Sequence, residues 1–200
     1  MLQTGGDSLE EPACPPVGDA RLAQLSPAKL LALAEEAEAA DEPVVAAALH
    51  TQRCLIAPSG DAAPWYAAGR FAMRNGQRGK AEEAFLQALV AERAHVPSLA
   101  ALSWLHLADG EATLAETYAR ECSAAAGADA PAPWLCLSMA YEMAGNEHET
   151  LNAEWQWKSL LAANPQPLFL DTALELLDLH LGSLAEKLLQ GEVCAFFHAV

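Results

Sequence analysis

The residues whose spacing best suits chemistry are His50 and Cys54, which stand four positions apart in a helix-forming stretch. Side chains at this spacing leave a helix on the same face, as the ligands of many zinc sites do. Two ligands do not make a site, and no second pair stands at a matching distance. We therefore interpret both as ordinary helix-face residues and predict no metal site and no cofactor.

Catalytic patterns are also missing from the sequence. It contains no glycine-rich phosphate loop, no G-x-S-x-G and no H-E-x-x-H. The pairs Glu35-Glu36 and Glu82-Glu83 are adjacent, so their carboxylates point to different faces of a helix and cannot act as a catalytic dyad. We predict that the chain has no catalytic residue and is not an enzyme.

Charge and cysteine content exclude several classes of binding partner and cellular compartment. The 27 acidic and 11 basic residues give a net charge of −16, which repels nucleic acid and anionic membranes. No run of 18 apolar residues predicts a membrane helix. The five cysteines are widely spaced and include no C-x-x-C, which favours reduced, mostly buried thiols and a cytoplasmic location. We expect residues 1–26, rich in proline, glycine and acidic residues, to form a disordered tail without a secretory signal.

The basic residues cluster in one part of this acidic chain. Five of the eleven are Arg70, Arg74, Arg78, Lys80 and Arg93. They either form a solvated face that balances nearby glutamates or a docking site for an acidic partner.

The elements that position these side chains follow from an internal repeat. Three columns recur in steps of 34, 34, 35 and 35 residues. The first holds large apolar residues, the second mostly small residues four positions later, and the third mostly small residues twelve positions after that. The columns are Leu31, Trp65, Leu99, Trp134 and Phe169; Glu35 (a poor match), Gly69, Ser103, Ser138 and Ala173; and Ala47, Ala81, Ala115, Thr150 and Ala185.

Turn residues divide each repeat into two helices. Gly76, Gly110 and Gly145 supply the turn in the middle three repeats, where a helix end favours positive φ. The first and last repeats look degenerate, with Glu42-Pro43 and a shifted Gly182 at this place. Prolines mark the junctions and give units 28–61, 62–95, 96–130, 131–165 and 166–199, which together form a solenoid over residues 27–200.

The unit PWYAAGRFAMRNGQRGKAEEAFLQALVAERAHVP resembles the tetratricopeptide consensus. The resemblance implies an all-α fold, a right-handed α-solenoid of about five helix pairs, whose first helices line a concave groove. It places a protein-binding groove that is basic at one end, apolar in the middle and acidic at the other, where Asp171 and Asp178 stand. The candidate groove residues are Tyr66, Arg70, Met73, Arg74, Trp104, Leu107, Leu135, Met139 and Met143.

Such a groove suits an amphipathic helix or an extended apolar segment of another protein. Alternatively, these residues pack against the chain's own tail or against neighbouring repeats of a longer scaffold. The Asn/Lys clamp of chaperone-binding tetratricopeptide proteins is absent, since Tyr66, Arg70, Ala100 and Ala101 occupy its positions. The apolar ending GEVCAFFHAV indicates either docking or truncation.

The segments HVPSLAALSWLHLADGEATLAETYAREC and APWLCLSMAYEMAGNEHETLNAEWQW are similar to the C-terminal repeats of a cilia- and flagella-associated tetratricopeptide family of the axonemal central apparatus. This resemblance covers roughly residues 64–190. It implies a scaffold of the motile-cilium axoneme and a chain that is one stretch of a longer protein. A general cytosolic adaptor, or the repeat arm of a larger enzyme whose catalytic domain lies elsewhere, remains the alternative.

Overall fold

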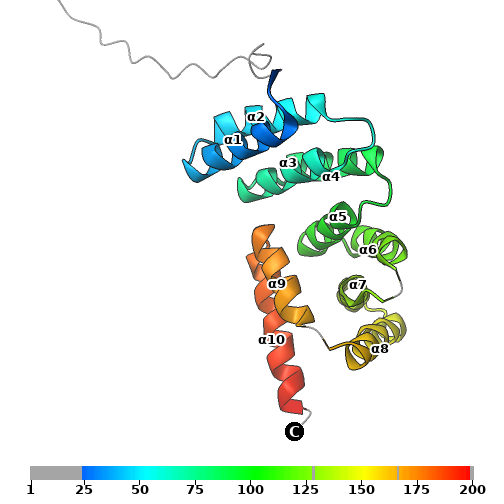
Figure 1. The fold of residues 1–200 in the computed structure, drawn as a ribbon. Coiled ribbons are helices and arrows are strands. Elements are labelled where there is room, and N and C mark those ends of the chain that lie inside the picture. The colour runs from blue at the N-terminus through cyan, green and yellow to red at the C-terminus, as the bar shows by residue number, and fades with distance from the viewer. Residues whose placement is uncertain (1–23, 128, 166, 199–200) are drawn as a thin grey trace, which may run out of the picture. The chain divides into compact units, whose positions relative to one another are not determined.

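The computed structural model describes residues 24–127, 129–165 and 167–198, with side chains described up to Gln190. Over these residues the chain forms ten helices and no strand, which confirms the all-α prediction (Figure 1). The predicted tail falls mostly on residues 1–23, outside the described part. The helices are α1 (Pro27–Ala39), α2 (Pro43–Ile56), α3 (Ala63–Arg74), α4 (Arg78–Ala91), α5 (Val96–Ala108), α6 (Ala112–Ala126), α7 (Pro131–Met143), α8 (Glu147–Ala163), α9 (Leu168–Asp178) and α10 (Gly182–His198).

Each odd-numbered helix packs against the helix that follows it, so the ten helices form five pairs. The chain divides into two compact units, residues 1–57 with the pair α1/α2 and residues 58–200 with the other four pairs. Within the second unit, α4 packs against α5 and α6 against α7, which joins three pairs in succession as a tetratricopeptide-like solenoid requires. This stack of α3 to α8 carries most of the predicted groove.

The turn inside every pair has the same backbone geometry. The second residue after the first helix takes positive φ, and the next backbone N–H donates to a carbonyl five residues back at 2.8–2.9 Å, as in a Schellman motif. Glycine supplies the positive φ in the three middle pairs, but Asp41 (φ 58°) and His180 (φ 55°) do so in the outer pairs. The outer repeats therefore differ from the others in residue type at this turn, not in its geometry.

This turn also corrects the predicted register of the first repeat. Leu30, Ala34 and Ala46 are fully buried, whereas Glu35 and Ala47 are exposed. The predicted columns of this repeat were therefore wrong by one residue. The first step of the repeat is 35 residues, from Ala34 to Gly69, which matches the step from Asp41 to Gly76.

Small residues permit the close approach of the paired helices. A Cβ atom added to Gly69 would lie 2.4 Å from the Phe85 ring, so only glycine fits there. Ser103 and Ser138 take the same place in the next two repeats. Each buried hydroxyl donates to the carbonyl three residues earlier at 2.8 Å, which satisfies the polar group inside the core.

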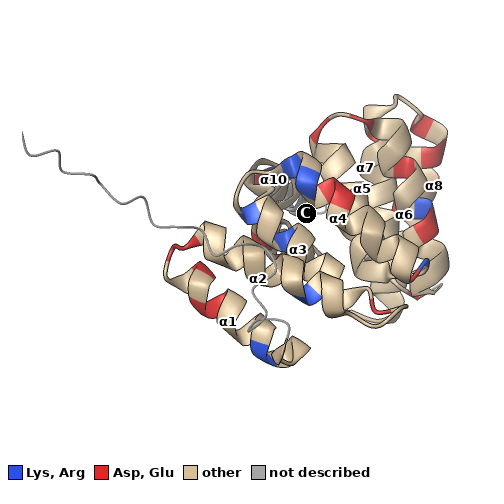
Figure 2. Cartoon of the chain, turned by 90° about the horizontal axis from the view of Figure 1, so that it is seen from above, with Lys and Arg blue, Asp and Glu red and all other residues tan. Residues whose placement is uncertain are grey.

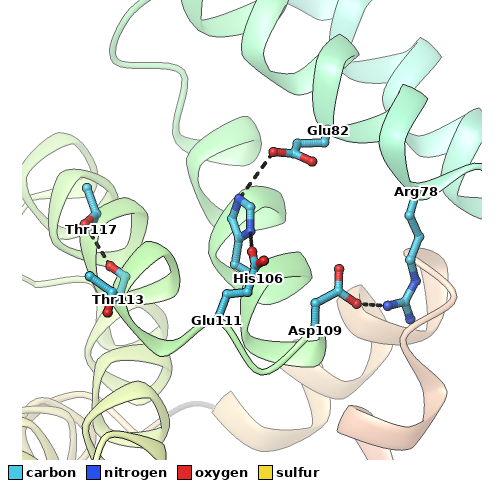
Figure 3. Close-up of polar contacts among 7 residues, drawn as sticks. All are labelled: Arg78, Glu82, His106, Asp109, Glu111, Thr113 and Thr117. Atoms are coloured by element: carbon cyan, nitrogen blue, oxygen red, sulfur yellow. Dashed lines mark hydrogen bonds and ion pairs between the residues drawn. The ribbon is translucent and has the colours of Figure 1, made fainter.

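Polar contacts connect successive repeats at an equivalent position, and Figure 3 shows the first of them, at His106. His106 of α5 lies between Glu111, 2.7 Å from its Nδ1, and Glu82 of α4, 3.8 Å from its Nε2. One repeat later, Tyr141 of α7 accepts a hydrogen bond of 2.7 Å from Arg120 of α6. The outer faces of α4 and α6 thus contact α5 and α7, three residues after the small residue of each first helix.

The fifth pair does not continue this pattern. The residues of α8 equivalent to Glu82 and Arg120 are Leu151 and Trp155, and these are 67% and 64% exposed. Helix α9 instead packs against α7, and Phe169 meets Trp157 of α8 edge-on at 5.4 Å. Figure 1 shows α9 and α10 beside α5 and α7, on the side away from α6 and α8. The hairpin of α9 and α10 therefore folds back along the first helices of the stack.

Candidate protein-binding groove

The nine candidate groove residues lie on α3, α5 and α7, but the structure gives them unequal access to solvent. Met73, Trp104, Leu107 and Leu135 are buried, with Trp104 only 1% exposed. Half-buried positions are taken by Tyr66, Arg70, Arg74 and Met139, and Met143 is 43% exposed. The apolar middle of the predicted groove is thus covered.

The hairpin of α9 and α10 covers these apolar groove residues. Leu176 of α9, Leu179 directly after it, and Leu184 and Leu188 of α10 belong to the same buried apolar cluster as Trp104 and its neighbours on the first helices. The alternative from the sequence had the groove pack against the chain's own tail or against neighbouring repeats of a longer scaffold, whereas here the predicted fifth unit, 166–199, covers it. Binding of a partner at these residues stays a prediction.

Two cavities in the described part of the chain border the predicted groove. The larger, of about 390 Å³, lies mainly between α5, α6 and α7, with Ser103, Trp104 and Cys136 in its lining and Glu175 of α9 at its edge. The smaller, of about 250 Å³, lies between Leu107, Met139 and Met143 on one side and Leu184 and Lys187 of α10 on the other. The hairpin therefore fills the groove incompletely.

Ion pairs attach the end of α9 to α3. Asp178 pairs with Arg70, and its second oxygen lies 3.7 Å from Arg74. Figure 2 marks the basic residues of α3. The sequence placed these arginines and Asp178 at opposite ends of the groove, and because α9 runs back toward α3, the two ends meet. That expected separation of charge along the groove was wrong.

Glu175 of α9 is a half-buried acidic residue at the edge of the larger cavity. Burial raises its pKa above the ordinary value of 4.5, the Asp178 carboxylate raises it further, and Arg70 opposes both. Burial also raises the pKa of the Tyr66 hydroxyl, with Glu175 adding to the rise. Both shifts follow from the closed position of α9, which removes these groups from water.

The other basic residues of the predicted cluster serve the stack or face solvent. Arg78 of α4 pairs with Asp109 at the end of α5, which connects two repeats (Figure 3). Lys80 and Arg93 are exposed. The solvated-face interpretation fits Lys80 and Arg93, whereas Arg70, Arg74 and Arg78 hold other elements in place.

The cysteines and histidines in the described part of the chain serve packing or ion pairs. Cys54, Cys122 and Cys136 are free, buried thiols, and burial raises the pKa of Cys136 to about 12. His50 contacts Glu38 at 2.8 Å across the first pair. Among the residues that the structure describes, no three His, Cys, Asp or Glu side chains gather as a metal site would need. Cys14, Cys194 and the apolar residues Val193, Phe196, Phe197 and Val200 lie outside the described side chains.

No helix in the described part of the chain has the length and apolar character needed to span a bilayer.

Paired helices, a shared turn geometry and the stacking of second helices on the following first helices define a tetratricopeptide-like repeat domain. Residues 30–161 match the family model described as the cilia and flagella-associated protein 70 middle TPR-like domain, and the chain belongs to this family. The match ends before α9, so the hairpin over the groove lies outside it. No curated protein matches the chain.

Proposed function

We propose that this chain is a non-catalytic scaffold that binds other proteins, and that it serves in the axoneme of the motile cilium or flagellum. The observation that carries the proposal is the family match over residues 30–161, joined to a stack of helix pairs that offers surface rather than a reactive site. Domains of the tetratricopeptide type generally mediate protein interactions.

The groove supports the binding part of this proposal. Of the predicted groove residues, Met139 is half-buried and Met143 is exposed, and methionine side chains adapt to the apolar face of a partner helix. Met139 and Met143 border a cavity that the hairpin leaves open. A partner that enters there is an amphipathic helix or extended segment of another protein.

The axonemal part is tested by expressing a tagged copy in a ciliated cell. We expect signal along the cilium, and diffuse cytosolic signal with an empty cilium would contradict the axonemal role. Such a result would favour the general adaptor or the arm of a larger enzyme.

A matched pair of variants tests whether the groove recruits the chain to its location. Met139→Asp with Met143→Asp places charge at the open cavity, whereas Leu151→Asp with Trp155→Asp places it on the exposed outer face of α8. We expect the first pair alone to lose the ciliary signal, provided that circular dichroism shows both proteins folded. Equal signal from both would contradict groove-dependent binding.

A further inference from the structure

The hairpin over the groove shows what kind of helix this surface accepts. Helix α9 buries Leu168, Thr172, Ala173 and Leu176, a spacing that produces one apolar face on a helix. The helix packs mainly against α10 and also contacts α7, and Leu168, Ala173 and Leu176 belong to the buried cluster that also contains Trp104. The helix beside the groove thus carries small and branched apolar residues on one face.

The charges of α9 fix its direction on the stack. Its first turn lies at α8, where Phe169 contacts Trp157, and its last turn lies at α3, where Asp178 pairs with Arg70 and Arg74. A helix placed in the opposite direction would lose these pairs. The acidic residue two positions after the buried leucine is therefore a recognition feature as well as a point of attachment.

The contact between α9 and the stack has features that favour the replacement of α9 by another helix. Arg70, Arg74 and Asp178 are each about a third exposed, in a setting where ion pairs contribute little stability. The half-buried Glu175 carboxyl opposes the packing of α9 because its charged form loses hydration. The cavity between Leu107 and Met139 on one side and Leu184 on the other shows that packing between hairpin and stack is incomplete.

We propose that α9 is an internal ligand of the groove, and that the external partner is an acidic amphipathic helix of the same chemistry, which displaces it. The proposal rests on the proposed function, since it names the partner class of the same groove. Such a partner presents apolar residues at the spacing of Leu168, Thr172 and Leu176, and an acidic residue at the place of Asp178. The apparent affinity for the partner is reduced by the fraction of chains in which α9 occupies the groove.

The test uses a fluorescein-labelled peptide of residues 167–181 and the full chain. Asp178→Arg in the chain places three positive groups together and releases α9, so the peptide should bind this variant at least ~10-fold more tightly than the unchanged chain. Asp171→Arg is the control, because it makes the same charge change at an exposed position of α9. It should leave peptide affinity at the level of the unchanged chain.

A charge swap tests direction and specificity. A peptide that itself carries Asp178→Arg should fail to bind the Asp178→Arg chain and recover binding when the chain also carries Arg70→Asp. If Asp178→Arg unfolds the chain by circular dichroism, Asp178→Asn replaces it, with a smaller expected gain. Equal affinity of the peptide for opened and unchanged chains, or equal binding of both peptides, would overturn the proposal. Because these measurements need no cilium, they fail or succeed independently of the axonemal role.

Discussion

Gly69 of α3 faces the ring of Phe85 of α4 so closely that an added Cβ would lie 2.4 Å from the nearest ring carbon. Phe85 is fully buried, and the contact fixes the distance between the two helices of this pair. A side chain at position 69 must push the ring or separate the helices, because protein interiors have no spare volume.

Gly69→Ala should therefore destabilise the chain by about 1–3 kcal/mol, the usual cost of overpacking a core. Urea unfolding followed by circular dichroism measures the change. Gly79→Ala is the control, since Gly79 also lies in a helix but has no atom within 4 Å of the added Cβ. That variant should gain up to about 1 kcal/mol, because alanine favours the helix. Equal effects of the two substitutions would argue against the close approach.

At the turn positions with positive φ, replacing glycine by alanine and replacing a non-glycine residue by glycine should change the stability of the chain in opposite directions. Gly110 has φ 82°, so Gly110→Ala should cost about 1 kcal/mol, whereas His180, at φ 55°, already bears the strain of a side chain. His180→Gly should be neutral or stabilise the chain by up to about 1 kcal/mol. Thermal unfolding at pH 7 compares the two. A marked loss of stability in His180→Gly would mean that its side chain, not the backbone turn, is important.

Glu175 predicts a pH dependence of stability. Its pKa is higher in the folded chain than in the unfolded chain, so the folded state loses stability as the pH rises through the range above 4.5. Glu175→Gln removes this loss. The variant should be more stable than the unchanged chain at pH 7, and the difference should shrink as the pH falls to about 4.5. Unfolding curves at several pH values measure it, and a difference independent of pH would contradict the buried position of Glu175.

Cys136 reports whether the groove is covered. Its thiol has a pKa of about 12 and is 1% exposed, so alkylation by iodoacetamide at pH 8 should be very slow in the folded chain. Asp178→Arg should raise the labelling of Cys136 several-fold, as read by mass spectrometry of the digested protein. Asp171→Arg should leave it unchanged. If both variants label alike, α9 is not what covers Cys136.

The repeat, the helix pairs and the family could be read from the sequence because they depend on local patterns. Large and small residues at fixed spacing identify the paired helices, and glycine identifies three of the five turns. The other two turns could not be predicted because Asp41 and His180 adopt a conformation that glycine usually takes. The register of the first repeat was missed for the same reason, since Asp41 is the residue that aligns it with Gly76.

The cover over the groove could not be read in this way, because α9 has the residue spacing of an ordinary repeat. Phe169, Ala173 and Ala185 continue all three columns, although the hairpin does not continue the stack. Two features of the sequence indicate the covered groove more weakly. Asp178 complements Arg70 and Arg74, and the outer face of α8 carries Leu151 and Trp155 where the preceding repeat carries Glu116 and Arg120.

The most direct test of the covered groove compares two tryptophans. In a regular open stack, Trp104 would face the empty groove and Trp155 would lie beneath a fifth pair. Here Trp104 is 1% exposed and Trp155 is 64% exposed. We predict that Trp104→Ala lowers the free energy of unfolding by about 3–5 kcal/mol, whereas Trp155→Ala changes it by less than about 1 kcal/mol. A small effect at Trp104 together with a large effect at Trp155 would contradict the account.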